Sequence, residues 1–277
     1  MTGVDPYVYP GTNVLRNKHG MRDPAALRAF EYERSAVRSV QIRKQPLPER
    51  FDLAHLKKLH KHLFQDVYEW AGEAREIDIA KGGVLFALPQ YIESEAKRIS
   101  ADLARENNLR GLDKAQFVER LAHHFGDWNA LHPFREGNGR ATREFLGQIA
   151  RGAGWDIDQT RIDNNKQQWN NASRDSNNGH MKPMEEILNY AVRPTRAIAF
   201  EQLSEQKAIK AHPELKGVFE TIKNMDATVK AGYPGQPSLH EATMQQVRVD
   251  VLKRLDAGLV VQAPALTQPP PERGPKR

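Results

Sequence analysis

The sequence predicts a mostly α-helical protein with one β-hairpin and a small helical C-terminal extension. Apolar residues recur at helical spacing along most of the 277-residue chain, and typical capping residues precede these runs. Only one segment carries the short apolar runs around Gly-Gly that are typical of a hairpin. We expect three parts: a main domain with an N-terminal arm (1–192), a helical extension (193–262) and a disordered, proline-rich basic tail (263–277).

The first two helices are predicted from the residues that begin and end them. Residues 1–24 are rich in Pro, Gly, Asn and Tyr, which favours an extended arm. Asp23 is a suitable N-cap, and Pro24 suits the first helical position, so a helix begins here and ends before Pro46. Asp52 is the predicted cap of a second helix, which has leucines along one side.

The hairpin is predicted from a change in residue pattern. Residues 76–80 alternate polar and apolar side chains, Lys81-Gly82-Gly83 has the composition of a tight turn, and 84–88 form a second apolar run that Pro89 ends. Two short runs around Gly-Gly are the usual signal of an antiparallel pair.

Helical spacing returns after the hairpin. The predicted helices cover residues 91–107, 113–129, 139–151, 164–173 and 184–192. Two or three further helices are expected in the extension.

Composition limits the classes of function. The chain has no cysteine, which excludes disulfides, thiolate nucleophiles and cysteine metal sites and is compatible with a reducing cytoplasm. No apolar run reaches the roughly 18 residues of a membrane span, and the N-terminus lacks a signal-peptide pattern. The net charge of +6 fits either a lysine-rich surface or an acidic partner such as a nucleotide.

Residues 132–143 concentrate the chemistry of the chain. They read His-Pro-Phe-Arg-Glu-Gly-Asn-Gly-Arg-Ala-Thr-Arg. Glycines let a backbone approach a ligand closely, and a helix that begins at Gly139 would point N–H groups at an anion. Arg140 and Arg143 share a helix face and can bind different phosphates. The segment therefore predicts a phosphate site.

Two further residues of this segment suit a reaction at that site. The Glu136 carboxylate can hold Mg²⁺ against phosphate oxygens. His132 is the side chain best suited to take a hydroxyl proton near neutral pH. The hypothesis is transfer of part of a nucleotide to an oxygen nucleophile.

The segment resembles the signature of the Fic family, His-x-Phe-x-(Asp/Glu)-Gly-Asn-Gly-Arg-x-x-Arg, and matches every fixed position. Segments 13–18, 66–72 and 81–86 are also similar to the family. The resemblance extends over about residues 7–192 and implies a helical Fic-type core with a hairpin called the flap.

The resemblance implies a protein adenylyltransferase, which passes AMP from ATP to a Tyr, Thr or Ser hydroxyl of a target protein. His132 would be the catalytic base, and Glu136 would act through Mg²⁺. The family's phosphate-binding positions correspond here to Gly137, Asn138, Gly139, Arg140 and Arg143.

The resemblance also assigns roles outside the signature core. Phe134 would be a buried anchor of the loop, and Trp169, Asn170 and Ala172 would line an adenine pocket. The flap would hold the target chain by strand addition. It consists of Ile79, Ala80, Lys81, Gly82, Gly83, Val84, Leu85 and Phe86.

The family's internal inhibitory sequence, (Ser/Thr)-x-x-x-Glu-(Gly/Asn), is absent from the chain. This absence implies restraint by a separate small antitoxin and toxicity without it. A bacterial type II topoisomerase or a host GTPase is the implied target. The implied location is the bacterial cytoplasm, with secretion into a host or recipient cell as the alternative.

Other hypotheses remain open at the level of the sequence. The same loop could transfer UMP, phosphate or phosphocholine, although Gly139, where phosphorylating relatives differ, favours nucleotidyl transfer. A basic nucleic-acid-binding regulator is suggested by the pI of about 9.4, and its binding would weaken steeply with salt. An interaction scaffold with an idle loop is the third class, and the intact motif argues against it.

Overall fold

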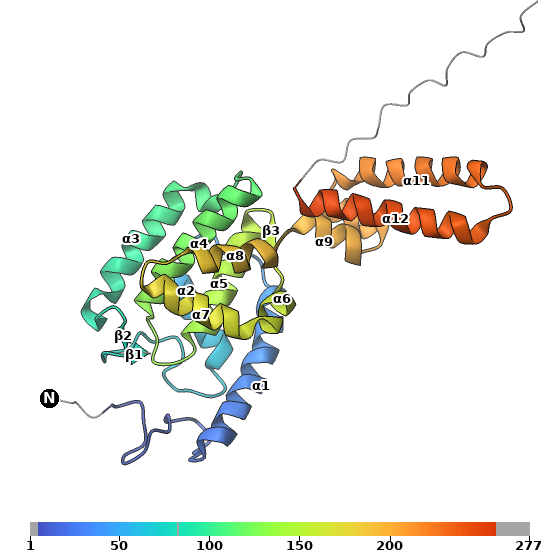
Figure 1. Cartoon of the computed structure of the whole chain (residues 1–277). Coiled ribbons are helices and arrows are strands. Elements are labelled where there is room, and N and C mark those ends of the chain that lie inside the picture. Colours follow the sequence, from blue (N-terminus) through green and yellow to red (C-terminus); the bar gives the residue numbers. More distant parts are fainter. Residues whose placement is uncertain (1–4, 82, 259–277) are drawn as a thin grey trace, which may run out of the picture. The chain divides into compact units, whose positions relative to one another are not determined.

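The computed structural model describes residues 5–81 and 83–258, which form parts of two compact units, 1–192 and 193–277. The described residues are mostly helical, and the predicted hairpin is present, so the predicted fold class is confirmed (Figure 1). Among them, no helix is both long enough and apolar enough to cross a membrane.

The first unit begins with an arm and two capped helices, α1 (Pro24–Arg43) and α2 (Leu53–Phe64). The Asp23 carboxylate accepts a hydrogen bond from the Ala25 N–H at 3.0 Å, and the Asp52 carboxylate accepts one from the His55 N–H at 2.9 Å. Both predicted N-caps are therefore confirmed.

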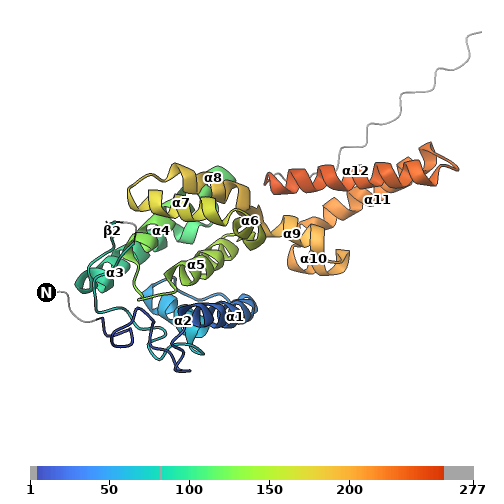
Figure 2. The same cartoon turned by 60° about the horizontal axis from the view of Figure 1, so that its bottom comes forward.

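Three longer helices follow, and the last of them lies in the middle of the unit. They are α3 (Ile92–Arg105), α4 (Lys114–Leu131) and α5 (Asn138–Gly152). Helix α5 packs against α2 and α4, and its residues 141–142 and 144–150 are buried (Figure 2). The helix that follows the signature loop is thus fixed on several sides by the core.

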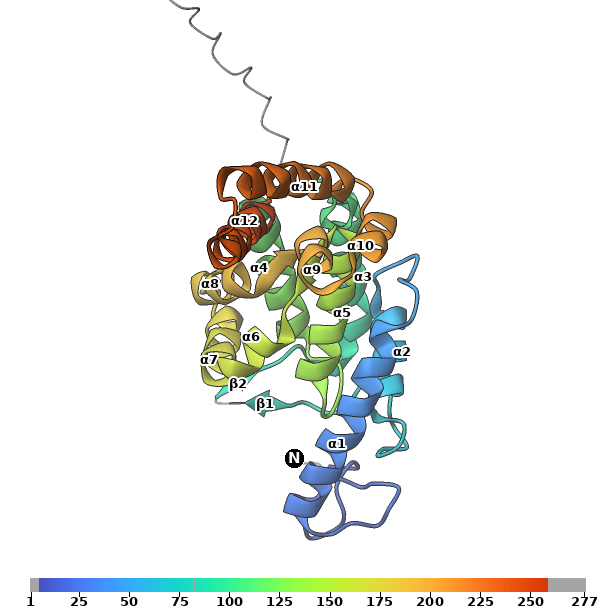
Figure 3. The same ribbon diagram turned by 90° about the vertical axis from the view of Figure 1, so that its right-hand side faces the viewer.

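The hairpin is very short. Strand β1 (Ala80–Lys81) pairs antiparallel with β2 (Val84–Leu85), with Ala80 opposite Leu85 and Lys81 opposite Val84 (Figure 3). Gly83 has a φ of 82°, which suits the turn, and Gly82 lies outside the described residues. Single 3₁₀ turns, η1 (Pro89–Tyr91) and η2 (Asn107–Leu109), flank α3.

The end of the first unit differs from the prediction. The helix expected over 164–173 is present, displaced by a few residues, and a short helix that was not predicted precedes it across non-helical backbone at Asn165 (φ −118°, ψ 31°). These are α6 (Gln159–Asn164) and α7 (Lys166–Asn177), and α8 (Lys182–Ala191) follows as expected. A second two-stranded sheet, β3 (Trp155–Ile157) with β4 (Val192–Pro194), was not predicted because each strand has only three residues.

The second unit has four helices within its described residues, more than the two or three expected. They are α9 (Thr195–Gln202), α10 (Glu205–Ala211), α11 (Leu215–Gly232) and α12 (Pro237–Asp256). They enclose a core of their own, which includes Phe200, Phe219 and Leu255. The predicted disordered tail, 263–277, lies outside the described residues.

Candidate active site

The signature loop joins the C-terminus of α4 to the N-terminus of α5. His132 follows α4 with a left-handed backbone (φ 46°), and its N–H donates to the Trp128 carbonyl at 3.2 Å. Gly137, also left-handed (φ 82°), is the N-cap of α5. The chain therefore reverses direction between the histidine and the helix that carries both arginines.

The His132 imidazole has a defined tautomer. Its Nδ1 lies 3.1 Å from the Asn129 carbonyl oxygen. Because a carbonyl only accepts, Nδ1 carries the proton and Nε2 keeps its lone pair. Burial, with the nearby charges of Lys81 and Arg75, lowers the pKa of His132 to about 4. The imidazole is therefore neutral at pH 7 and can accept a proton.

The flap holds this imidazole from one side. The Phe86 ring stacks on the His132 ring with a centroid separation of 3.7 Å and an interplanar angle of 14°. Phe86 is only 6% exposed, and its N–H donates to the Ile79 carbonyl at 3.2 Å. Phe86 thus orients the histidine, whereas the resemblance had implied a place on the target-docking face.

Sequence reasoning missed Arg75, which connects the flap to the loop. Its guanidinium is buried, no carboxylate among the described residues forms a salt bridge with it, and burial lowers its pKa. It donates to the carbonyls of His132 and Ile77, each at 2.8 Å, and also to the Ala87 carbonyl. A single arginine in a sequence forms no motif, so the sequence does not predict which backbone carbonyls its guanidinium contacts.

Asn138 closes the inner side of the loop. Its side-chain oxygen accepts from the Phe134 N–H at 2.8 Å, and its amide nitrogen donates to the Phe134 carbonyl at 2.7 Å. Phe134 is fully buried, as the prediction of a loop anchor required. The Asn138 side chain is therefore engaged in holding the loop through its two hydrogen bonds to Phe134.

His60 supports the loop from α2, whereas sequence analysis alone places it only on a helix face. Its Nε2 donates to the Glu136 carbonyl at 2.9 Å, and its Nδ1 accepts from the Gly72 N–H at 2.8 Å. Its ring stacks on Phe134 at 3.8 Å. Burial lowers the pKa of His60 to about 3, so the ring is a neutral structural support.

Gly139 lies on the open side of the loop. A Cβ atom built at Gly139 would have no heavy atom within 4 Å, so the packing of the protein does not require glycine there. The first N–H groups of a helix have no intrahelical partner and carry a partial positive charge. The N-terminus of α5 is therefore accessible at Gly139 and suited to an anion.

Glu136 is well placed to reach a ligand. Its side chain is 49% exposed, and Oε1 accepts from the Gly137 N–H at 2.9 Å. The described residues contain no group of three metal-ligating side chains. The single carboxylate of Glu136 fits Mg²⁺, because this ion is commonly bound by one or two carboxylates together with substrate phosphates and water.

The two signature arginines have different surroundings. Arg140 is paired with buried Glu31, and its Nη1 donates to Ser35 Oγ at 3.0 Å. Arg143 pairs with the largely exposed Asp163 at 3.1 Å. A groove of about 220 Å³ includes both arginines. Arg140 is thus held by a buried carboxylate, whereas Arg143 is held by an exposed one.

The residues expected in an adenine pocket are dispersed. Trp169 and Ala172 are buried in α7, with Trp169 packed edge-on against Phe125, while Asn170 is exposed. Ala172 lines a cavity of about 520 Å³ that also includes Asn171. The three positions therefore do not share one open surface.

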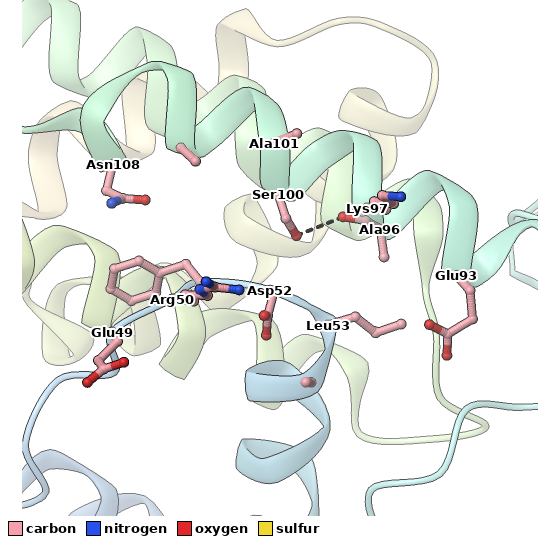
Figure 4. A pocket seen from close by; sticks show the side chains of 13 residues that line it. Glu49, Arg50, Asp52, Leu53, Glu93, Ala96, Lys97, Ser100, Ala101 and Asn108 are labelled. Carbon is pink, nitrogen blue, oxygen red and sulfur yellow. Dashed lines mark hydrogen bonds between the residues drawn. The ribbon is translucent and has the colours of Figure 1, made fainter.

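Another cavity, of about 500 Å³, lies between the start of α2 and α3, where Figure 4 shows Asp52, Glu93 and Lys97. It contains no residue of the signature loop. This cavity is therefore separate from the candidate catalytic residues of the signature loop.

The chain matches known proteins over the part that carries this loop. The family model described as Fic/DOC family matches residues 50–150. Protein adenylyltransferase VbhT of Bartonella schoenbuchensis is 45% identical over 184 residues, which are 66% of this chain and 38% of VbhT. The probable protein adenylyltransferase Fic of Escherichia coli is 40% identical over 69% of this chain and 93% of that protein. The chain thus spans well under half of VbhT and nearly all of the E. coli protein.

Solved structures agree with the sequence matches. The BepC protein of Bartonella tribocorum, a VirB-translocated effector crystallised with AMPPNP, superposes with a TM-score of 0.65 at 31% identity, covering 68% of this chain and 96% of that one. The N-terminal Fic domain of a Bartonella quintana effector with bound ADP gives 0.64 at 31% identity, covering 68% and 94%. The chain belongs to the Fic/DOC family.

Proposed function

We propose that the protein is an adenylyltransferase that moves AMP from ATP to a hydroxyl group of a target protein. The observation that carries the proposal is the pairing of a neutral His132, whose Nε2 keeps its lone pair, with a loop that leads into the open first turn of α5. The names of the relatives and the nucleotides in their structures support it.

The roles follow from the geometry. The backbone at 137–139 and the side chains of Arg140 and Arg143 hold the triphosphate. His132 Nε2 takes the proton of the target hydroxyl, whose oxygen bonds to the α-phosphorus. The bond from that phosphorus to the oxygen bridging the α- and β-phosphates breaks, and pyrophosphate leaves with the electron pair.

Magnesium belongs to this proposal as a cofactor. Glu136 would hold it, because its carboxylate is exposed beside the first turn of α5. A bound Mg²⁺ would offset negative charge on the phosphates. Removal of divalent ions with EDTA should abolish transfer, and addition of MgCl₂ should restore it.

The direct test uses ATP that carries a label on its α-phosphate. Purified protein with bacterial or eukaryotic lysate should label a protein band, and mass spectrometry should find AMP on a Tyr, Thr or Ser. Label in the band from γ-phosphate ATP, or unchanged labelling by His132→Ala, would contradict the proposal. The two lysates also separate the proposed targets, a bacterial type II topoisomerase and a host GTPase.

Target docking is proposed for the flap. The edge strands β1 and β2 expose Ala80, Lys81 and Leu85, which leaves backbone groups accessible for strand addition. Replacing Leu85, 58% exposed, with Pro should reduce labelling of the target without changing ATP binding.

A separate small antitoxin is proposed as the restraining partner. The groove that contains Arg143 is bordered by exposed apolar side chains of α1, with Tyr32 67% and Val40 56% exposed. A helix with a carboxylate facing Arg143 fits this chemistry. Expression of the chain should arrest bacterial growth, and this arrest should depend on His132. A co-expressed antitoxin should relieve the arrest caused by the parent chain but not the arrest caused by the Val40→Asp variant.

The proposed place of action is the bacterial cytoplasm, with delivery into another cell as the alternative. The alternative is suggested by the structural neighbours that are described as VirB-translocated effectors. Fractionation of the native host, and a translocation reporter fused to the chain, distinguish the two.

Transfer of UMP, phosphate or phosphocholine by the same loop is the second candidate. Competition of labelled ATP with UTP and CDP-choline would show UMP or phosphocholine transfer as a preference for another donor, and label from γ-phosphate ATP in the target would show phosphate transfer.

A further inference from the structure

A buried carboxylate from α1 contacts the first signature arginine. Glu31 is 6% exposed, and its two oxygens have different partners: Oε1 accepts from Arg140 Nη2, and Oε2 accepts from the Tyr68 hydroxyl. Tyr68 is itself buried at 1% exposure. The carboxylate is therefore fixed at both oxygens before any ligand arrives.

The Arg140 guanidinium has two further contacts with α1 and α2. Nη1 donates to Ser35 Oγ at 3.0 Å, and the guanidinium carbon lies 4.6 Å from the centre of the Phe64 ring. Glu31, Ser35 and Phe64 come from α1 and α2, which the core holds in place. The arginine thus has one preferred position at the start of α5.

Charge explains why this support matters. Two carboxylates face Arg140: buried Glu31, and exposed Glu136, whose Oε1 is 4.0 Å away. If the exposed Glu136 carboxylate alone held Arg140, the guanidinium would shift whenever that carboxylate moved, for example when it bound a cation. The buried carboxylate keeps the guanidinium oriented independently of Glu136.

We propose that Glu31 is a positioning residue that, through Arg140, sets the affinity of the site for the phosphates of the nucleotide. The proposal rests on the proposed function, because it takes Arg140 as a phosphate ligand. A preorganised guanidinium loses less conformational freedom on binding, and charge-assisted hydrogen bonds to phosphate depend on its orientation.

The experiment compares ATP and adenosine binding to Glu31→Gln. The substitution keeps the size of the side chain and removes its charge. A His132→Ala background prevents consumption of ATP, and ligand-observed NMR and calorimetry give the affinities. ATP binding should weaken about tenfold, as expected for a misplaced charge-assisted contact. Adenosine binding should stay within about twofold, since adenosine lacks phosphates.

The matched control is Asp66→Asn. Asp66 forms a two-point pair with Arg38 of α1, at 2.8 and 2.7 Å, so it also links α1 to the end of α2 through arginine and carboxylate. It has no contact with Arg140, and ATP affinity should stay within about twofold.

A second variant keeps the inference testable if Glu31→Gln does not fold. Tyr68→Phe removes only the hydroxyl that fixes Glu31 Oε2, and ATP affinity should fall about threefold, as for loss of one hydrogen bond.

Three results would overturn the inference. Tighter ATP binding by Glu31→Gln would mean that the carboxylate competes with phosphate for Arg140. Equal weakening of ATP and adenosine would mean a general loss of structure, and unchanged ATP affinity would mean that Arg140 needs no support. Failure of the proposed function is different: the parent chain itself would then bind no ATP or transfer no AMP.

Discussion

Gly137 and Gly139 lie two residues apart in one loop, yet their surroundings are opposite. A Cβ at Gly137 would clash with the Phe64 ring and lie 3.1 Å from His60 Nε2, on a backbone with φ of 82°. A Cβ at Gly139 would meet nothing within 4 Å. The inner side of the loop serves the fold, and the outer side is left for a ligand.

The same division extends to the rest of the signature. Phe134 and Asn138 point inward and hold the loop, while Glu136 and Arg143 point outward. The His132 carbonyl accepts a hydrogen bond from Arg75, which holds the backbone, while the contact of Nδ1 with the Asn129 carbonyl leaves the lone pair on Nε2. A short motif can thus specify both a rigid loop and a reactive surface, and the following predictions test this division.

The largest effect is expected at the catalytic base. Asn tolerates the left-handed backbone of His132 but cannot accept a proton, so His132→Asn should lower transfer about 10³-fold. AMP labelling of the target measures the rate, and calorimetric ATP affinity is the control that should not change. Substantial residual transfer would show that another group is the base.

The two glycines give the sharpest contrast between the sides. Gly137→Ala should reduce the free energy of unfolding by about 3 kcal/mol or more, because it combines a steric clash with an unfavourable φ. Gly139→Ala should stay within about 1 kcal/mol of the parent but bind ATP at least about tenfold more weakly. Urea denaturation and ATP titration measure the two effects, and equal stability loss in both variants would disprove the division.

Replacing Arg75 tests whether its hydrogen bonds hold the flap and the signature loop together. Arg75→Met keeps the apolar stem but leaves the carbonyls of His132, Ile77 and Ala87 without their donor. The free energy of unfolding should fall by about 2–3 kcal/mol, and transfer should fall as His132 loses its orientation. Arg110→Met, whose guanidinium donates to the Gly152 carbonyl at the other end of α5, is the control and should have a smaller effect.

The smallest effect is a pH dependence of stability. The folded pKa of His132 is about 4, below the ordinary 6.5, so between these values the unfolded chain binds more protons than the folded one. Stability is therefore lost as the pH falls below 6.5, by about 2 kcal/mol between pH 7 and pH 5 for this residue.

Urea denaturation at pH 7 and pH 5 checks this sign. His132→Asn should lose less stability on acidification than the parent, by that same amount. A His132→Asn variant with the full response would mean that His132 is not the source.

The sequence by itself determined the helical class, the capped helices at Asp23 and Asp52, the hairpin and the reactive loop. These features depend on local rules: side-chain periodicity, capping residues and turn residues that act within a few positions of one another. The resemblance to the Fic family rested likewise on residues 132–143, which are contiguous.

Only the tertiary structure decided which residues support that loop. Glu31, His60 and Arg75 come from segments 57 or more residues before their partners in the loop, and no local pattern indicates which carbonyl or guanidinium each will meet. The same holds for the break at Asn165 and for the pairing of β3 with β4. Contacts between distant segments depend on how helices pack, and packing is a property of the whole core that no short stretch of sequence contains.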